Sequence, residues 1–68
     1  MNEENFNMSI RKFLKMTGVG SQREIEQAVG RALAAGKLKG SERLPVRMKL
    51  TIPALGLDVD FESEIALE

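Results

Sequence analysis

The chain has 68 residues, with ten Lys or Arg against ten Asp or Glu, 43% hydrophobic residues and no Cys, His, Trp or Tyr. The missing cysteines exclude disulfides and thiolate metal sites, and the missing histidines exclude imidazole ligands and bases. Because one core in so short a chain rarely supplies more than about 3–5 kcal/mol, we expect a single small domain, residues 1–68, that gains stability by self-association. We do not expect an enzyme, since most side chains that serve as nucleophile or general base are absent.

The first predicted element is a helix over residues 3–17. Five residues recur with helical spacing and form one stripe opposite the basic residues: Phe6, Ile10, Phe13, Leu14 and Thr17. Asn2 is suited to cap the first turn, and Glu3 and Glu4 would lie near the positive end of the helix dipole. Gly18 predicts the end of this helix, because glycine adopts a left-handed backbone without steric cost.

A second helix is predicted over residues 22–35. Ser21 and Glu24 have the spacing of a capping box, in which each side chain bonds a free amide of the first turn. The apolar positions that follow are Ile25, Ala28, Val29, Ala32 and Leu33. Gly36 predicts the end of the helix, and residues 37–45 have no period and predict a loop.

Two strands are predicted over residues 46–52 and 57–66, because apolar and polar residues alternate there. The four residues 53–56 would form the turn of an antiparallel hairpin. If Ile52 pairs with Leu57, the register places Lys49 opposite Asp60 and Arg47 opposite Glu62. These opposite charges favour that register.

The predicted fold is α+β, with two N-terminal helices packed on a C-terminal antiparallel β-hairpin in the order ααββ. A lone hairpin is marginal in water, so the helices should cover its apolar face. We expect the core to contain Phe13, Leu14, Ile25, Val29, Leu33, Leu50, Val59 and Phe61.

Charge is balanced overall but uneven along the chain. Residues 11–49 contain all ten basic residues and three acids, a local charge of +7, whereas residues 50–68 have a local charge of −5. One interpretation is a surface that orients charged partners, with Arg11, Lys12 and Lys15 as candidate partner-binding residues. The alternative is that the chain neutralises its own charges, as the predicted strand register already suggests.

The second predicted helix also invites comparison with a helix-turn-helix motif. Arg23, Gln27 and Arg31 would lie one turn apart on its outward face, as candidate residues for a nucleic acid. Two features argue against nucleic-acid binding: the acidic residues Glu24 and Glu26 flank these candidate residues, and the net charge of the chain is zero. Weak nucleic-acid binding is therefore the alternative function, and a protein-interaction module is the expected one.

No catalytic, cofactor-binding or metal-binding residues are predicted. Side chains two apart on a strand are roughly 6.5–7 Å from each other, so the alternating acids of residues 58–64 cannot converge on one ion. No apolar run approaches the length that a bilayer needs, and Met1–Glu4 lacks the basic start of a signal peptide. We therefore expect a cytoplasmic protein with no membrane contact.

A homodimer is the expected assembly, with an unidentified protein partner as the further option. The hairpin would leave two strand edges with unpaired amides and carbonyls, which natural proteins usually pair or blunt. Acidic residues would repel their own copies on the edge of residues 57–67. The edge of Val46–Ile52 is therefore the predicted contact, against the alternative of a monomer that covers its edges by another route.

The chain resembles a domain-of-unknown-function family of very short bacterial proteins. The resemblance rests on the segments 7–16, 21–26, 34–38, 50–53 and 64–68, and it extends over nearly the whole chain. It implies a bacterial source and a small stand-alone protein. It implies no activity and assigns no functional residues.

Overall fold

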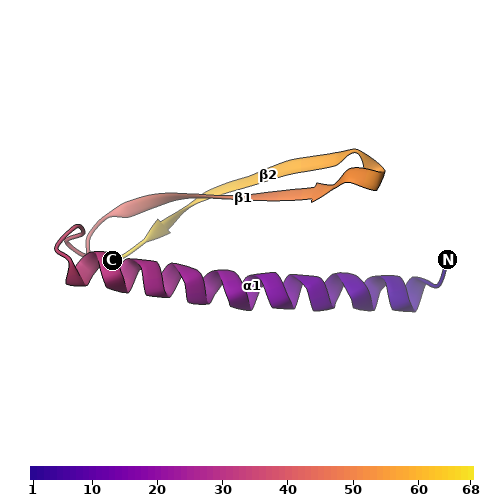
Figure 1. Ribbon diagram of the computed structural model, residues 1–68, viewed down its shortest axis with the longest axis horizontal. Helices are drawn as coiled ribbons and strands as arrows, with labels where there is room; N and C mark the ends of the chain where they lie inside the picture. The colour runs from indigo at the N-terminus through magenta and orange to yellow at the C-terminus, as the bar shows by residue number, and fades with distance from the viewer. The chain divides into compact units, whose positions relative to one another are not determined.

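The computed structural model of the chain contains one long helix followed by a two-stranded hairpin (Figure 1). The elements in chain order are the helix α1 (Glu3–Ala34), the strand β1 (Arg43–Ile52), the 3-10 turn η1 (Pro53–Leu55) and the strand β2 (Leu57–Ala66). By its internal contacts the chain divides into two units, Met1–Lys37 and Leu38–Glu68. Each unit is therefore described by itself.

The helical unit corrects the predicted fold. The chain is α+β, but the two helices predicted over residues 3–17 and 22–35 are one continuous helix, and the ααββ order is wrong. Gly18 and Gly20 keep helical backbone, because positive φ angles occur only at Gly36, Gly40 and Gly56. A glycine inside a helix costs about 1 kcal/mol relative to alanine, whereas a break would leave several amides and carbonyls without helical partners. Continuing the helix is therefore the less costly solution.

The two ends of α1 confirm the predicted signals. At the start, Asn2 caps the helix, and its Oδ1 accepts a hydrogen bond from the amide of Asn5 at 3.1 Å. At the end, Gly36 has φ +73° and donates to the carbonyl of Leu33 at 3.1 Å. Lys37 donates to the carbonyl of Ala32 at 2.9 Å. This pair of bonds is the Schellman motif, which satisfies the last carbonyls of a helix.

The hairpin confirms the predicted antiparallel pairing and its register. Ile52 pairs with Leu57, Lys49 with Asp60 and Arg47 with Glu62. Gly56 closes the turn with φ +62°, a left-handed conformation in which glycine avoids the cost of a Cβ atom. β1 begins at Arg43, so the loop predicted over residues 37–45 is shorter than expected. Figure 1 shows the two strands crossing in projection, as expected for the strong twist of a two-stranded ribbon.

The predicted core is wrong, because no residue of the chain is buried. Phe13 keeps 46% of its surface exposed, Leu14 59% and Phe61 60%. One helix or one two-stranded sheet cannot enclose a side chain, since a core forms between at least two packed layers. The large apolar side chains of both units therefore lie on open surfaces.

Candidate interaction surfaces

One face of the hairpin is almost entirely apolar, and we refer to it as the sheet face. It consists of Leu44, Val46, Met48, Leu50 and Ile52 from β1 and Leu57, Val59, Phe61, Ser63 and Ile65 from β2. The register sets these residues opposite one another, so that Met48 faces Phe61 and Leu50 faces Val59. Met48 is 46% exposed and Phe61 60%. Contiguous exposed apolar patches of this kind are typical of interaction sites.

The opposite face of the hairpin, the polar face, has three ion pairs. The ammonium group of Lys49 lies 2.6 Å from Asp58 Oδ1 and 3.8 Å from Asp60 Oδ1, and Arg43 Nε lies 3.6 Å from Glu64 Oε2. All of these side chains are well exposed, so each pair contributes at most about 1 kcal/mol. On this face the chain does neutralise part of its own charge.

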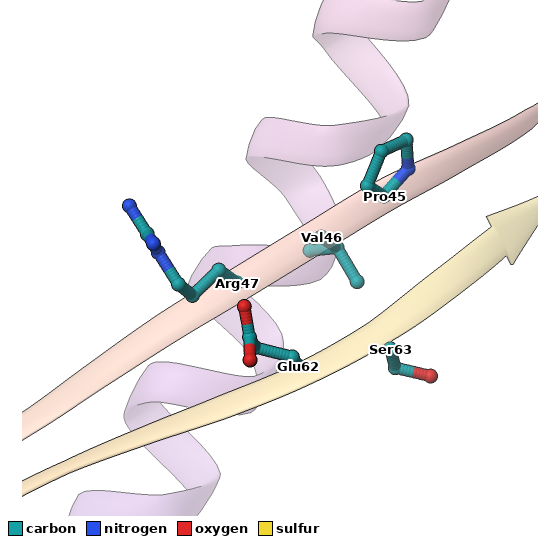
Figure 2. A pocket seen from close by; sticks show the side chains of 5 residues that line it. All are labelled: Pro45, Val46, Arg47, Glu62 and Ser63. Atoms are coloured by element: carbon teal, nitrogen blue, oxygen red, sulfur yellow. The ribbon is translucent and has the colours of Figure 1, made fainter.

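Arg47 is the exception on the polar face. It pairs in register with Glu62, but no ion pair joins the two side chains. Figure 2 shows its guanidinium group extending away from the Glu62 carboxylate. The two residues line a shallow, open hollow together with Pro45, Val46 and Ser63. Small-molecule sites are usually concave and mostly apolar, so this hollow does not have the features of one.

The outer edge of β1 was the predicted dimer contact. The amide of Leu67 donates to the carbonyl of Glu42 at 3.0 Å, which fixes the alternation of the ladder bonds. The backbone groups that bond across to β2 therefore belong to residues 44, 46, 48, 50 and 52. The backbone groups directed outward belong to residues 43, 45, 47, 49 and 51. Pro45 lies in this outward set and has no amide N–H to offer.

Apolar and small hydroxyl residues of α1 form one winding line, the helical stripe. Its members are Phe6, Ile10, Leu14, Thr17, Ser21, Ile25, Ala28 and Ala32, with Phe13 beside its first half and the half-buried Val29 beside its second. Spacings of four, four and three residues repeat along it, which gives a period of eleven residues. Phe6 is 49% exposed and Ile10 40%. Large apolar side chains lie in both halves of α1, since Ile25 and Val29 follow Ser21.

The six candidate partner-binding residues all lie on α1, exposed and outside any ion pair. Helical rotation places the group Arg11, Lys12 and Lys15 about a third of a turn away from the group Arg23, Gln27 and Arg31. The helix therefore does not gather them into one basic face. The helix-turn-helix arrangement is wrong, because α1 has no turn between its halves.

The loop before β1 contains a site that the sequence did not predict. The carboxylate of Glu42 accepts hydrogen bonds from the amides of Lys39 at 2.8 and 3.1 Å, Gly40 at 2.9 Å and Ser41 at 3.2 Å. The bond from Lys39, with smaller contributions from the other amides, lowers the pKa of Glu42 below its ordinary value of 4.5. Successive amides that converge in this way bind anions, and here the chain supplies its own. The only signal in the sequence was an acid close behind a loop glycine.

Two further classes of site find no geometric support. No group of three or more carboxylates lies close enough together to hold a metal ion. α1 is long, but no helix of the structure is both long and apolar enough to cross a membrane.

Comparison with known proteins gives one result for the whole chain. Residues 1–68 match a family model described as a family of unknown function (DUF6494), so the chain belongs to that family. This confirms the resemblance to a family without assigned activity. No curated protein and no solved structure matches the chain.

Proposed function

We propose that this member of the DUF6494 family is a non-enzymatic interaction module that acts by associating with a second copy of itself. The observation that supports the proposal is the absence of any buried residue in a chain that exposes apolar side chains along both of its units. We propose the cytoplasm as its compartment. The absence of cysteine is compatible with that compartment.

Each unit lacks a source of stability within itself. A helix in water depends mainly on packing of its apolar face, and none of the 32 residues of α1 is buried. An isolated two-stranded hairpin is marginally stable at best, and no residue of this one is buried either. Burial against another copy would supply the missing free energy, because binding to the folded state stabilises it.

A second copy is favoured over an unrelated partner because the chain brings two kinds of apolar surface. The sheet face is broad, whereas the helical stripe is a narrow line along α1. A sheet face and helices are complementary layers in packed domains. Two copies together therefore have the elements that a two-layered core requires.

Contact through the outer edge of β1 has less support than contact through the apolar surfaces. Pro45 removes a donor from that edge, and two-fold pairing would bring Arg47 and Lys49 close to their own copies. Nucleic-acid binding also has less support, since the basic candidates of α1 lie on two separate faces.

Sedimentation equilibrium from micromolar to millimolar concentration tests the proposal. We expect a mass above 7.5 kDa that rises with concentration. Phe61→Gln should weaken association at least 10- to 100-fold, because each copy loses a side chain whose burial contributes roughly 1.5–3 kcal/mol. A 7.5 kDa species at every concentration would overturn the proposal.

Glu62→Gln is the matched control, since Glu62 follows Phe61 on the same strand but lies on the polar face. We expect it to leave the association constant nearly unchanged. Equal effects of the two substitutions would count against burial of the sheet face.

A further inference from the structure

We propose that the outer edge of β2 binds an extended segment of a different protein, in which basic residues alternate with apolar ones. The segment would add a third strand to the hairpin, a mode of recognition called β-augmentation. The site is separate from the apolar surfaces of the proposed dimer and requires no second copy of the chain. Three features support it: the free backbone groups of the edge, the acidic side chains beside them and the apolar side chains on the other face.

The outer edge of β2 has free hydrogen-bonding groups along its length. β2 has β1 on one side only, and the ladder between them leaves the backbone groups of alternate residues directed outward. These outward residues are Asp58, Asp60, Glu62, Glu64 and Ala66. No hydrogen bond within the chain uses their outward amides or carbonyls. None of them is proline, so the edge offers a donor and an acceptor at every second residue.

The side chains of these outward residues make the edge acidic. Asp58, Asp60, Glu62 and Glu64 lie on the polar face, on the side where a third strand would be added. Lys49 pairs with the two aspartates and Arg43 with Glu64, whereas no ion pair engages Glu62. Opposite charges directly across a strand pair stabilise it, and like charges destabilise it. The edge therefore favours a strand with Lys or Arg on this face.

The other face of the same strand favours apolar residues in the partner. Phe61 is 60% exposed and Val59 38% exposed, and both lie on the sheet face of β2. An added strand would place every second side chain on the sheet face beside them. Aromatic and β-branched side chains that neighbour each other across strands stabilise a sheet. The matching segment therefore alternates basic residues with Val, Ile or similar apolar residues.

A second copy of the chain fits this edge poorly. β2 of another copy would set the four acids against one another. β1 of another copy has the required alternation, but its outer edge lacks an amide N–H at Pro45. Charged side chains on an edge strand commonly protect it against pairing with itself. The edge thus disfavours the chain's own strands and leaves its backbone groups to a basic strand of another protein.

A nine-residue peptide of alternating lysine and valine, with both ends blocked, is the probe for this site. Hydrogen exchange of the full chain reports which amides it covers. At saturation we expect exchange to slow about tenfold or more at the outward amides of Asp60, Glu62 and Glu64. The inward amides of Val59 and Phe61, which already bond to β1, should slow less.

A peptide of alternating glutamate and valine is the matched control. It has the same backbone and the opposite charge, so we expect it not to bind. If the lysine peptide at millimolar concentration and low salt slows none of the outward amides, the proposal is overturned. Slowing by both peptides would overturn the preference for a basic segment.

Peptides with N-methyl groups separate strand addition from attraction between charges alone. Consecutive amides of a strand point alternately toward its neighbour and away from it. Methylation of all lysine amides or of all valine amides therefore blocks the paired edge of the peptide in one case and its outer edge in the other. We expect one of these peptides to lose binding and the other to retain it. Equal behaviour of the two would overturn backbone pairing.

Glu62→Pro tests the edge from the side of the protein. The proline ring removes an outward amide and leaves the bonds to β1 in place, as Pro45 does on β1. We expect about tenfold weaker binding of the lysine–valine peptide, because one hydrogen bond is lost and its neighbours are disturbed. Glu62→Gln is the matched control, since it removes only the charge and should weaken binding less than about fivefold. Equal effects of the two would overturn the role of the backbone edge, and the methylated peptides decide the same question with the unaltered chain.

Discussion

The hairpin and the helix expose their apolar side chains in different ways. On the hairpin, cross-strand pairing places apolar residues of β1 beside apolar residues of β2, so that one chain forms a broad, continuous sheet face. On α1, apolar side chains lie along a narrow line, with Phe6 and Ile10 in its first half, Ile25 in its second, and Phe13 and Val29 beside it. A broad face offers a partner more apolar area than a narrow line, and the free energy of association from apolar burial grows with that area. The hairpin would thus contribute more of the affinity than the helix.

The largest effect that tests this comparison is expected from Gly20→Pro. Proline inside a helix removes a backbone hydrogen bond and clashes with the preceding turn, at a cost of about 3 kcal/mol. Because α1 continues through residue 20, we expect a large loss of helical signal in circular dichroism and a lower melting temperature.

Gly20→Ala is the control for this substitution. A Cβ atom at residue 20 meets nothing within 4 Å in one chain, so helix content should rise. If Gly20→Pro melts as the wild type does, the chain turns at this position, and the helical stripe is distributed over two separate helices.

A smaller effect is expected on the hairpin from Lys49→Gln. Lys49 makes ion pairs with Asp58 and Asp60, and exposed pairs contribute about 0.2–1 kcal/mol. The free energy of unfolding in urea should fall by an amount in that range at low salt, and the loss should shrink at high salt. Arg47→Gln is the matched control, because Arg47 lies on the same face without an ion pair. Equal losses would mean that the ion pairs of the polar face do not stabilise the hairpin.

The smallest effect is expected in the loop that joins the two regions. The pKa of Glu42 is lowered by the hydrogen bond from the Lys39 amide and its neighbours, so its contribution to stability is present above pH 4.5. That contribution is lost as pH falls through the lower pKa of the folded chain. Titration followed by NMR should show the amides of Lys39, Gly40 and Ser41 shifting together, with a midpoint below 4.5. Glu42→Gln should abolish the transition, and a midpoint at or above 4.5 would contradict the hydrogen bonds.

Local signals predicted the parts of the fold that local interactions determine. Asn2 and Gly36 mark the ends of α1 because each supplies a cap within a few residues of itself. The strand register was predictable because it depends on the alternation of apolar and polar residues and on the length of the four-residue turn. Both features are determined by residues that are close together in the sequence. Gly18 and Ser21 led to a wrong prediction, because a glycine and a capping residue lower the cost of a helix break without requiring one. A continuous helix forms more backbone hydrogen bonds than two helices with a break between them.

The candidate surfaces were harder to predict than the elements. Each of the six proposed partner-binding residues is exposed as expected, but their distribution over two faces depended on whether one helix or two were present. The predicted core failed because it assumed a packing of helix on sheet that no local pattern encodes. The sequence predicts a loop at Pro45, whereas the ladder bonds place this residue on the outer edge of β1.

That position of Pro45 bears on whether the sheet can be extended by further copies along its edge. The two edges of the hairpin carry opposite charges, with Arg43, Arg47 and Lys49 along one and acids along the other. Copies stacked edge to edge in the same direction would attract one another, and such head-to-tail contacts extend into open filaments unless the rotation between copies closes a ring. Proline on an edge strand interrupts this kind of sheet extension, because each added strand would face a missing donor. The pyrrolidine ring of Pro45 thus opposes edge-to-edge growth of the sheet while leaving the apolar faces open for the proposed association.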